Sequence, residues 1–360
     1  MRVAFIGTRG VPARYSGFET CVEQVGSRMV DQGHEVVVYC RSMHYAERLA
    51  EYRGMKLRYL PAVNQKHLET LSHTALSALR LPRGTAIVCM GVGNAPVVRY
   101  LELTGRRVVF NVDGADWQRE KWGRFPRWYL RTCERLAAKG KSVVLADAEA
   151  VQSYYAREYG RDSEIVRYGA DPPTERGTEV LEKFGLEPGA YLLFVGRMVP
   201  ENAPDDYLEG VRQAGLDAPA VVVGDASYAG KYKDSLRAMA PSNAIFTGYQ
   251  FGSAYQQLSA HAGMFVLAAT VGGTHPVLVE QMAAGNAILA RETDSNREVL
   301  GDTALFWRTP AELAEQLREV WPDRARRLKL GDCAKARAHE LYDWGQVTKR
   351  YLELCERSLS

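Results

Sequence analysis

Short apolar runs alternate with segments of helical periodicity along the whole chain. Residues 2–6 and 35–40 are apolar runs typical of buried strands. A strand, a helix and a second strand in this order form a βαβ unit, which predicts a parallel sheet. The apolar side chains that recur at helical spacing between the two runs predict a helix over about residues 17–32: Phe18, Cys21, Val22, Val25 and Met29.

The ends of this helix are marked by local signals. Ser16 followed by Glu19 has the spacing of a capping box, and Gly33 provides a stop. Further apolar runs continue the alternation and predict strands at 57–60, 86–90, 107–112 and 143–146.

A second copy of the same plan begins after a stretch rich in Pro, Gly and charge at 169–190, which we interpret as the domain linker and its surroundings. Strand 190–195 is followed by a glycine-containing turn and by a helix that opens near Pro204. The chain is therefore expected to hold two α/β sheets in tandem, the first over residues 1–170 and the second over 171–341, with a final helix at 342–360 packing back on the first. Further strands of the second sheet are expected at 219–223, 244–247, 264–268 and 287–290.

Composition narrows the class of protein. The 360 residues suit two domains, and 46% hydrophobic with 25% charged residues is a soluble globular composition. A net charge of +3 is too small to indicate nucleic-acid binding. No run is long enough for a membrane span, and we expect no signal peptide. The cysteines lack Cys-x-x-Cys spacing, so we expect reduced thiols and a cytoplasmic location.

The turn after the first strand holds Gly7, Gly10 and Gly17. A glycine-rich turn that opens a helix can bind a phosphate through its backbone N–H groups. The spacing is not the Gly-x-Gly-x-x-Gly of a dinucleotide site, and a plain strand-to-helix turn fits equally well.

Two stretches of the second half repeat this chemistry. Gly196-Arg197 follows a strand, where an Arg can bind a pyrophosphate, although a surface Arg is the alternative. Gly272-Gly273-Thr274 precedes a helix that starts near Pro276. Glu280 lies one turn into that helix among apolar neighbours and needs a partner, either a ribose diol or an Arg.

Other polar groups have more than one interpretation. Asp113 lies beyond a strand end, where it suits an active-site rim. His275 fits either a cleft lining or a helix cap. No residues have metal-ligand spacing, so no metal is expected. The basic, aromatic helix at about 124–139 suits an anionic membrane surface, with a solvated helix as the alternative.

The motifs "GTRGVPARYSGFET", "NVDGADWQREKWG", "VGRMVPEN", "VGDASYAGKYK" and "VGGTHPVLVEQMAAGNAILA" together resemble glycosyltransferase family 4, and in particular its bacterial rhamnosyltransferase-like subgroup. The resemblance covers roughly residues 1–345. It implies the GT-B fold, two Rossmann-like parallel-sheet domains facing across a cleft. It also implies retaining, metal-independent transfer from a nucleoside-diphosphate sugar.

The resemblance also implies roles for individual residues. Gly17 with Gly10 and Ser16 would lie against the donor diphosphate, and Gly196-Arg197 would bind the pyrophosphate. Glu280 would hold the ribose, and Tyr249 would contact the base. Gly272, Gly273, Thr274 and His275 would face the sugar.

Three positions depart from the family pattern. Gly272 stands where the first of two Glu residues is usual, and Asn202 where a Lys is usual. Asp113 stands where the family has a His that contacts the sugar near its 6-hydroxyl, which would suit a 6-deoxyhexose such as rhamnose. Arg9, Arg14 and Lys231 are candidates to replace the missing Lys.

The expected partners are a nucleotide-sugar donor and a glycan, lipid-linked or small-molecule acceptor, in the cytoplasm or at the inner face of the membrane. Three alternatives remain: a nonenzymatic nucleotide-sugar binder, a nucleotide-sugar epimerase, and an NADP-dependent oxidoreductase in which Arg41 would bind the 2′-phosphate.

Overall fold

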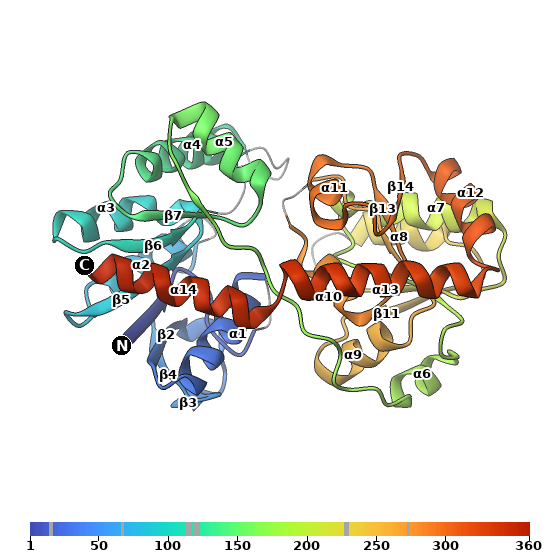
Figure 1. The fold of residues 1–360 in the computed structure, drawn as a ribbon, viewed down its shortest axis with the longest axis horizontal. Helices are drawn as coiled ribbons and strands as arrows, with labels where there is room; N and C mark the ends of the chain where they lie inside the picture. Colours follow the sequence, from blue (N-terminus) through green and yellow to red (C-terminus); the bar gives the residue numbers. More distant parts are fainter. Residues whose placement is uncertain (14–16, 66–67, 113–116, 118–122, 227–229, 272–273) are drawn as a thin grey trace. The chain divides into compact units, whose positions relative to one another are not determined.

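In the computed structural model, which describes residues 1–13, 17–65, 68–112, 117, 123–226, 230–271 and 274–360, the chain divides into two compact units (Figure 1). Unit 1 holds Met1–Tyr168 and Trp344–Ser360, and unit 2 holds Gly169–Asp343. The sequence pattern places the corresponding divisions at 170/171 and 341/342.

Within the described residues, unit 1 has an eight-stranded sheet in the order β3-β4-β2-β1-β5-β6-β7-β8. Its strands pair in parallel, except that the short β3 runs antiparallel to β4. The predicted parallel sheet is confirmed. The strands are β1 Arg2–Ile6, β2 Glu35–Arg41, β3 Glu51–Tyr52, β4 Met55–Leu60, β5 Thr85–Met90, β6 Val108–Asn111, β7 Val143–Ala146 and β8 Glu164–Ile165.

Helices cover this sheet, and the last helix of the chain is one of them. Cys21 of α1 donates to the Tyr351 hydroxyl of α14 at 3.7 Å, and Asn111 of β6 donates to the same hydroxyl at 3.4 Å. The C-terminal helix therefore packs on unit 1. The helices of this unit are α1 Gly17–Asp31, α2 Glu69–Ala78, α3 Ala95–Leu103, α4 Arg124–Ala138, α5 Glu149–Tyr159 and α14 Trp344–Leu359.

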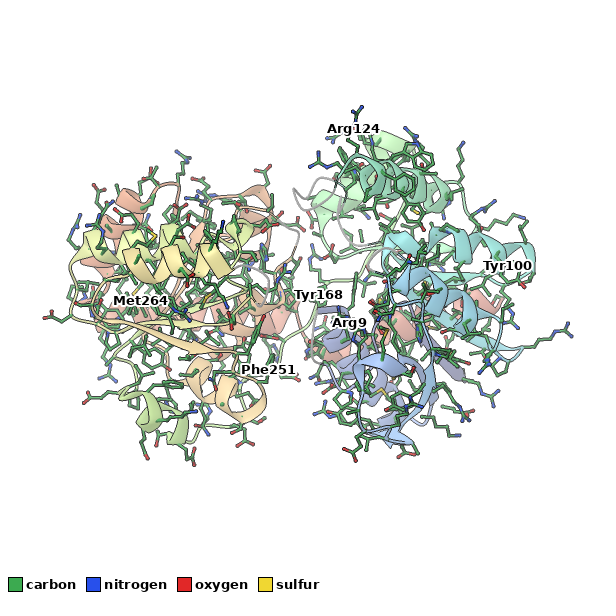
Figure 2. All side chains as sticks on the ribbon, turned by 180° about the vertical axis from the view of Figure 1, so that it is seen from behind. Arg9, Tyr100, Arg124, Tyr168, Phe251 and Met264 are labelled. Carbon is green, nitrogen blue, oxygen red and sulfur yellow. The ribbon has the colours of Figure 1, made fainter. Side chains whose placement is uncertain are left out.

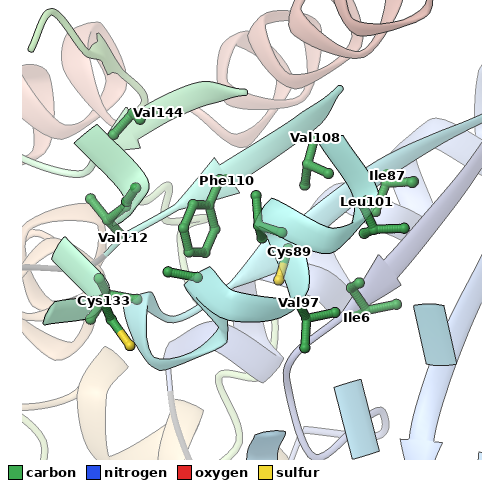
Figure 3. Packing of buried hydrophobic residues seen from close by; sticks show 14 of the residues in the cluster. Ile6, Ile87, Cys89, Val97, Leu101, Val108, Phe110, Val112, Cys133 and Val144 are labelled. Carbon is green, nitrogen blue, oxygen red and sulfur yellow. The ribbon is translucent and has the colours of Figure 1, made fainter. Parts of the chain in front are cut away.

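The core of unit 1 follows from the alternation of side chains along its strands (Figure 3). Ile6 and Phe110 point to the same face of the sheet and pack against Val97 and Leu101 of α3 and Cys133 of α4. The cysteines expected in the core, Cys21, Cys40 and Cys89, are buried and reduced.

Within the described residues, unit 2 has a six-stranded parallel sheet in the order β11-β10-β9-β12-β13-β14. The strands are β9 Leu192–Val195, β10 Ala220–Val223, β11 Ala244–Gly248, β12 Met264–Leu267, β13 Ile288–Arg291 and β14 Leu305–Trp307. The helices are α6 Glu179–Phe184, α7 Pro204–Ala214, α8 Gly230–Met239, α9 Gly252–Ala260, α10 Pro276–Ala284, α11 Asp294–Leu300, α12 Pro310–Val320 and α13 Arg324–Leu341.

The stretch 169–190 is not a linker throughout. Residues 179–184 form α6, whose Val180 and Leu181 are buried. The backbone N–H of Val180 donates to the Gln257 side chain of α9 at 3.1 Å. The sequence pattern did not predict this helix, which two apolar side chains anchor on unit 2. None of the helices in the described part of the chain is both long enough and apolar enough to cross a membrane.

Candidate functional site

The glycine-rich turn of unit 1 connects β1 to α1, which begins at Gly17. Gly10 has φ +117°, and a Cβ on it would lie 2.5 Å from the Cys40 sulfur of β2. The packing of the turn against β2 is therefore enough to require glycine here, without any ligand. The backbone N–H of Arg9 donates to Glu19 at 3.0 Å, and that of Ala13 donates to Glu23 at 2.9 Å. Two amides of this turn are thus already bound to carboxylates of α1.

Several predicted groups cannot be placed around this turn. Ser16 and Arg14 lie outside the described residues, as does Asp113 after β6. The expected capping box therefore has only its Glu19 in the described part of the chain, and that carboxylate is buried.

Arg41, at the end of β2, has a defined structural role. Only 5% of the residue is exposed, and its guanidinium contacts Glu69 at 2.7 Å and the Thr70 hydroxyl at 3.0 Å. The His44 ring lies 2.5 Å from the same Glu69 oxygen. The expectation that Arg41 binds a 2′-phosphate is wrong, because a buried and paired guanidinium is not available to a ligand. The oxidoreductase alternative loses the residue that supported it.

In unit 2, Gly196 and Arg197 directly follow β9. Gly224 follows β10 with φ +130°, and a Cβ on it would lie 2.0 Å from the Gly196 oxygen. The turns after β9 and β10 are therefore in direct contact. Asn202, which replaces the usual Lys, donates its side-chain N–H to the Arg197 carbonyl at 2.8 Å and so holds the turn. The Arg197 residue is exposed.

Two aromatic rings follow β11, the strand next to β10 in the sheet. The rings of Tyr249 and Phe251 stack with centroids 5.7 Å apart, and the two residues are 50% and 65% exposed. The Tyr249 hydroxyl donates to the Asp225 carbonyl at 2.8 Å. Figure 2 labels Phe251 in unit 2. Such an exposed, fixed pair offers a flat apolar surface to an aromatic ligand.

A cation contacts the same Asp225 to which Tyr249 donates. Lys233 of α8 contacts the Asp225 carboxylate at 2.7 Å, and this bond lowers the pKa of Asp225. Lys231, the candidate in unit 2 to replace the missing Lys, is exposed in the first turn of α8. Sequence reasoning missed Lys233, although both lysines stand in the same quoted motif.

Glu280 lies in α10, four residues after Pro276. Its carboxylate accepts a hydrogen bond of 2.5 Å from the Tyr255 hydroxyl of α9. Burial raises the pKa of Glu280 to about 7, and the bond to Tyr255 acts in the opposite direction. Gln281 donates to the Tyr255 hydroxyl at 3.3 Å and to Ser259 at 2.8 Å. Within the described residues no Arg pairs with Glu280, and a tyrosine occupies the place expected for one.

The residues before α10 are partly described. Thr274 is buried, and His275 occupies the N-cap position, where its side chain makes no capping bond. Its carbonyl accepts the N–H of Leu278 at 2.9 Å. Gly272 and Gly273 lie outside the described residues.

The strand order brings these groups together. The carboxyl ends of β11, β10, β9 and β12 follow one another along one edge of the unit 2 sheet. They carry, in that order, Tyr249, Asp225, Arg197 and the segment leading to α10. Thr270 of that segment donates its N–H to the Glu201 carbonyl at 3.0 Å, which ties it to the turn after β9. An aromatic platform, an exposed cation and a helix N-terminus thus line one sheet edge, the place where open α/β sheets bind ligands.

In the described stretches, no three His, Cys, Asp or Glu side chains gather in a way that could hold a metal ion.

Both halves of the chain match families of known domains. Residues 16–169 match the family described as a glycosyl transferase 4-like domain, and residues 189–323 match the glycosyl transferases group 1 family. No curated protein matches the chain in sequence.

Solved structures of similar fold cover nearly the whole chain. Sucrose-phosphate synthase from Thermosynechococcus elongatus has a TM-score of 0.82 at 15% identity, over 99% of this chain and 98% of that one. HepE from Anabaena, in complex with UDP-glucose, has a TM-score of 0.81 at 17% identity, over 99% and 100%. WaaG, a glycosyltransferase involved in lipopolysaccharide biosynthesis, has a TM-score of 0.75 at 16% identity, over 98% and 99%. These neighbours confirm the predicted GT-B fold.

Proposed function

We propose that this chain, a glycosyltransferase by both of its domains, moves a sugar from a nucleoside-diphosphate sugar to a hydroxyl of an acceptor with retention of configuration and without a required metal. The observation that carries the proposal is the row of groups along the unit 2 sheet edge. Together with Glu280 of α10, these groups provide partners for the base, the ribose and the diphosphate of such a donor.

Each part of the donor has a partner in this row. The base stacks on Tyr249 and Phe251, whose rings are exposed and parallel within 20°. The ribose hydroxyls bind the Glu280 carboxylate, which accepts a hydrogen bond from Tyr255. The diphosphate binds Arg197, Gly196 and the N-terminus of α10. The binding of UDP and UDP-glucose by HepE, a protein of the same fold, supports a uridine-diphosphate donor.

The chemistry follows from charge. As the bond from the sugar C1 to the β-phosphate oxygen breaks, negative charge grows on that phosphate and the sugar becomes oxocarbenium-like. Arg197 and the helix N-terminus stabilise the charge, so catalysis is mainly electrostatic. The acceptor oxygen forms its bond to C1 from the side of the leaving group, and the departing phosphate oxygen takes the acceptor proton.

Unit 1 supplies the acceptor side in this proposal. Gly10, Ser16 and Gly17 approach the diphosphate, Asp113 orients the sugar or the acceptor, and Thr274 and His275 with Gly272 and Gly273 face the sugar. Asp113 in place of a His suits a 6-deoxyhexose such as rhamnose, and the acceptor is a glycan, a glycolipid or a natural product. A role in polysaccharide biosynthesis, in the cytoplasm or at the inner membrane face, would fit these acceptors.

The test is a transfer assay with the full chain, UDP-glucose or dTDP-rhamnose, and a panel of acceptors, with and without EDTA. We expect EDTA-insensitive turnover and a product of retained anomeric configuration by NMR. Arg197→Ala is expected to lose ~10²–10³ in rate. Arg324→Ala, at an exposed arginine of α13, is the control and should keep its rate. Donor binding without turnover on any acceptor would instead support the nonenzymatic binder.

A further inference from the structure

A depression of about 600 Å³ lies at the amino ends of β6, β7 and β8 in unit 1, and we call it the amino-end depression. The three strands are parallel neighbours, so their amino ends share one edge of the sheet. The glycine-rich turn after β1 lies at the opposite edge, where the carboxyl ends of the parallel strands meet. The depression is therefore separate from the edge that the proposed function uses. Its charged lining residues are Arg107, Lys141, Arg161, Asp162, Glu164 and Arg357.

Positive charge exceeds negative charge in this lining, which holds four cations and two carboxylates. The Glu164 carboxylate is already neutralised, because Arg350 and Arg357 of α14 contact its two oxygens at 2.6 and 2.7 Å. These contacts, that of Arg357 most strongly, lower the pKa of Glu164. Among the described residues, no ion pair involves any of the other three cations of the lining. Their charge is thus available to an anion.

The turns that carry these cations are held in place by hydrogen bonds. The buried Glu102 carboxylate of α3 accepts the backbone N–H groups of Lys141 at 2.8 Å and of Ser142 at 2.7 Å. The Arg161 guanidinium donates to the Ser142 carbonyl at 2.6 Å. Because this part of the lining is ordered by the fold itself, a ligand would bind there at a small entropic cost.

Two polar atoms of the lining lack a protein partner. Arg161 Nε and Ser163 Oγ are buried and make no hydrogen bond to the described residues. Buried polar atoms of folded proteins are almost always bonded to protein, water or an ion. The lining therefore combines positive charge with donors that the fold does not satisfy, as a site for an oxyanion requires.

We propose that the amino-end depression binds a small phosphorylated compound at a site separate from that of the sugar donor. The phosphate would lie among Arg107, Lys141 and Arg161, which donate charge-assisted hydrogen bonds. A phosphate monoester carries close to two negative charges at neutral pH and so matches the excess charge of the lining. A volume of about 600 Å³ is typical of small-molecule sites and leaves room for an organic part, which a mainly polar lining requires to be hydrophilic. This inference does not depend on the proposed function, because it uses no group of unit 2.

The test is isothermal titration calorimetry of the full chain with inorganic phosphate, ribose 5-phosphate and ribose. We expect both phosphates to bind, more weakly as salt increases, and ribose not to bind. A hydrogen bond from a charged donor is worth about ten-fold in affinity, so Arg107→Gln/Lys141→Gln should raise the dissociation constant at least ~10-fold. Asp162→Asn removes the carboxylate of the lining that has no arginine partner and should lower the dissociation constant roughly 2- to 5-fold.

Two controls separate this site from net charge and from the donor site. Arg124→Gln/Arg127→Gln makes the same charge change at exposed residues of α4 and should bind as the unchanged chain does. Arg197→Ala, in unit 2, should also leave phosphate binding unchanged. Lys141→Gln alone replaces the first double variant if thermal unfolding shows that it folds poorly. The proposal would be overturned by absence of phosphate binding, by equal losses in both double variants, or by loss of binding in Arg197→Ala.

Discussion

The Tyr255 hydroxyl donates a hydrogen bond of 2.5 Å to the Glu280 carboxylate. The two residues lie in neighbouring helices of unit 2, α9 and α10, and both have raised pKa values because of burial. The pair holds a carboxyl group that titrates near neutral pH inside α10, the helix that follows the sheet edge where we propose that the donor binds. This relationship gives two linked predictions.

Uridine-nucleotide binding should depend on pH through Glu280. Ribose hydroxyls donate to an ionised carboxylate, and the pKa of this group is raised from 4.5 to about 7. UDP affinity should therefore rise as the pH increases through 7, measured by isothermal titration calorimetry. Glu280→Gln should bind more weakly and lose this dependence.

The stability of the folded chain should depend on pH in the opposite direction. Between pH 4.5 and about pH 7 the folded chain holds a proton on Glu280 that the unfolded chain has lost, so the free energy of unfolding falls as pH rises.

Tyr255→Phe should move the midpoint of that pH profile upward. The hydroxyl lowers the pKa of Glu280 by donating to its ionised form, so its loss leaves burial unopposed. Tyr232→Phe is the matched control, because the Tyr232 hydroxyl donates to Asp205 at 2.8 Å, a second tyrosine–carboxylate bond of unit 2. An identical midpoint in all three proteins would contradict the positioning of Glu280 by Tyr255.

The aromatic pair should carry affinity for the base. Stacking of a base on an aromatic ring is worth ~1–3 kcal/mol, so Tyr249→Ala and Phe251→Ala should each weaken UDP binding by roughly 5- to 150-fold. Ribose 5-phosphate, which lacks a base, should bind these variants and the unchanged chain equally. Tyr100→Ala, at a tyrosine of unit 1 that is 46% exposed, controls for loss of a surface ring.

Gly224→Ala should destabilise unit 2 well beyond the effect of backbone conformation alone. The new Cβ would lie 2.0 Å from the Gly196 oxygen, in addition to the strain of φ +130°. Gly215→Ala is the matched control, since it has φ +65° and nothing within 4 Å of its Cβ. Thermal unfolding should show a much larger drop for Gly224→Ala, and equal drops would contradict the close contact of the two turns.

Arg41→Ala should destabilise unit 1 by about 2 kcal/mol, because it removes a buried guanidinium with its hydrogen bonds to Thr70 and to the partly buried Glu69 carboxylate. Arg2→Ala breaks the exposed pair with Glu35, whose two side chains are 41% and 35% exposed, and should cost less than about 1 kcal/mol. Urea denaturation measures both. A small loss for Arg41→Ala would mean that the residue is not structural and would reopen a ligand-binding role.

The sequence was sufficient to predict the two parallel sheets, because their central strands are continuous apolar runs next to turns that contain glycine. It did not indicate β3 Glu51–Tyr52 or β8 Glu164–Ile165, since two-residue edge strands have no apolar run. The helix α6 was hidden by its charged and glycine-rich surroundings, and only the burial of Val180 and Leu181 reveals it.

The residues of the candidate site also divide into those that the sequence indicates and those that only the structure reveals. Arg197 and Glu280 are recognisable because each follows a local signal, a strand end or a helix start. Tyr255 is not, because only the packing of α9 on α10 brings its hydroxyl to a carboxylate 25 residues away. Arg41 was misassigned because a strand end looks the same in sequence whether its side chain is exposed or buried. Phe251 could have been found, since it stands two residues after Tyr249 in the same loop.

The most direct test of the central claim is a thermal-shift measurement of the full chain with UDP, dTDP, GDP, ADP and NADP. A ligand at 100 times its dissociation constant stabilises the folded state by ~2.7 kcal/mol, which is readily detected. The account predicts a shift with UDP or dTDP that Glu280→Gln reduces, and none with NADP. A shift with NADP alone would contradict it and would leave the glycosyltransferase fold without a nucleotide-sugar donor.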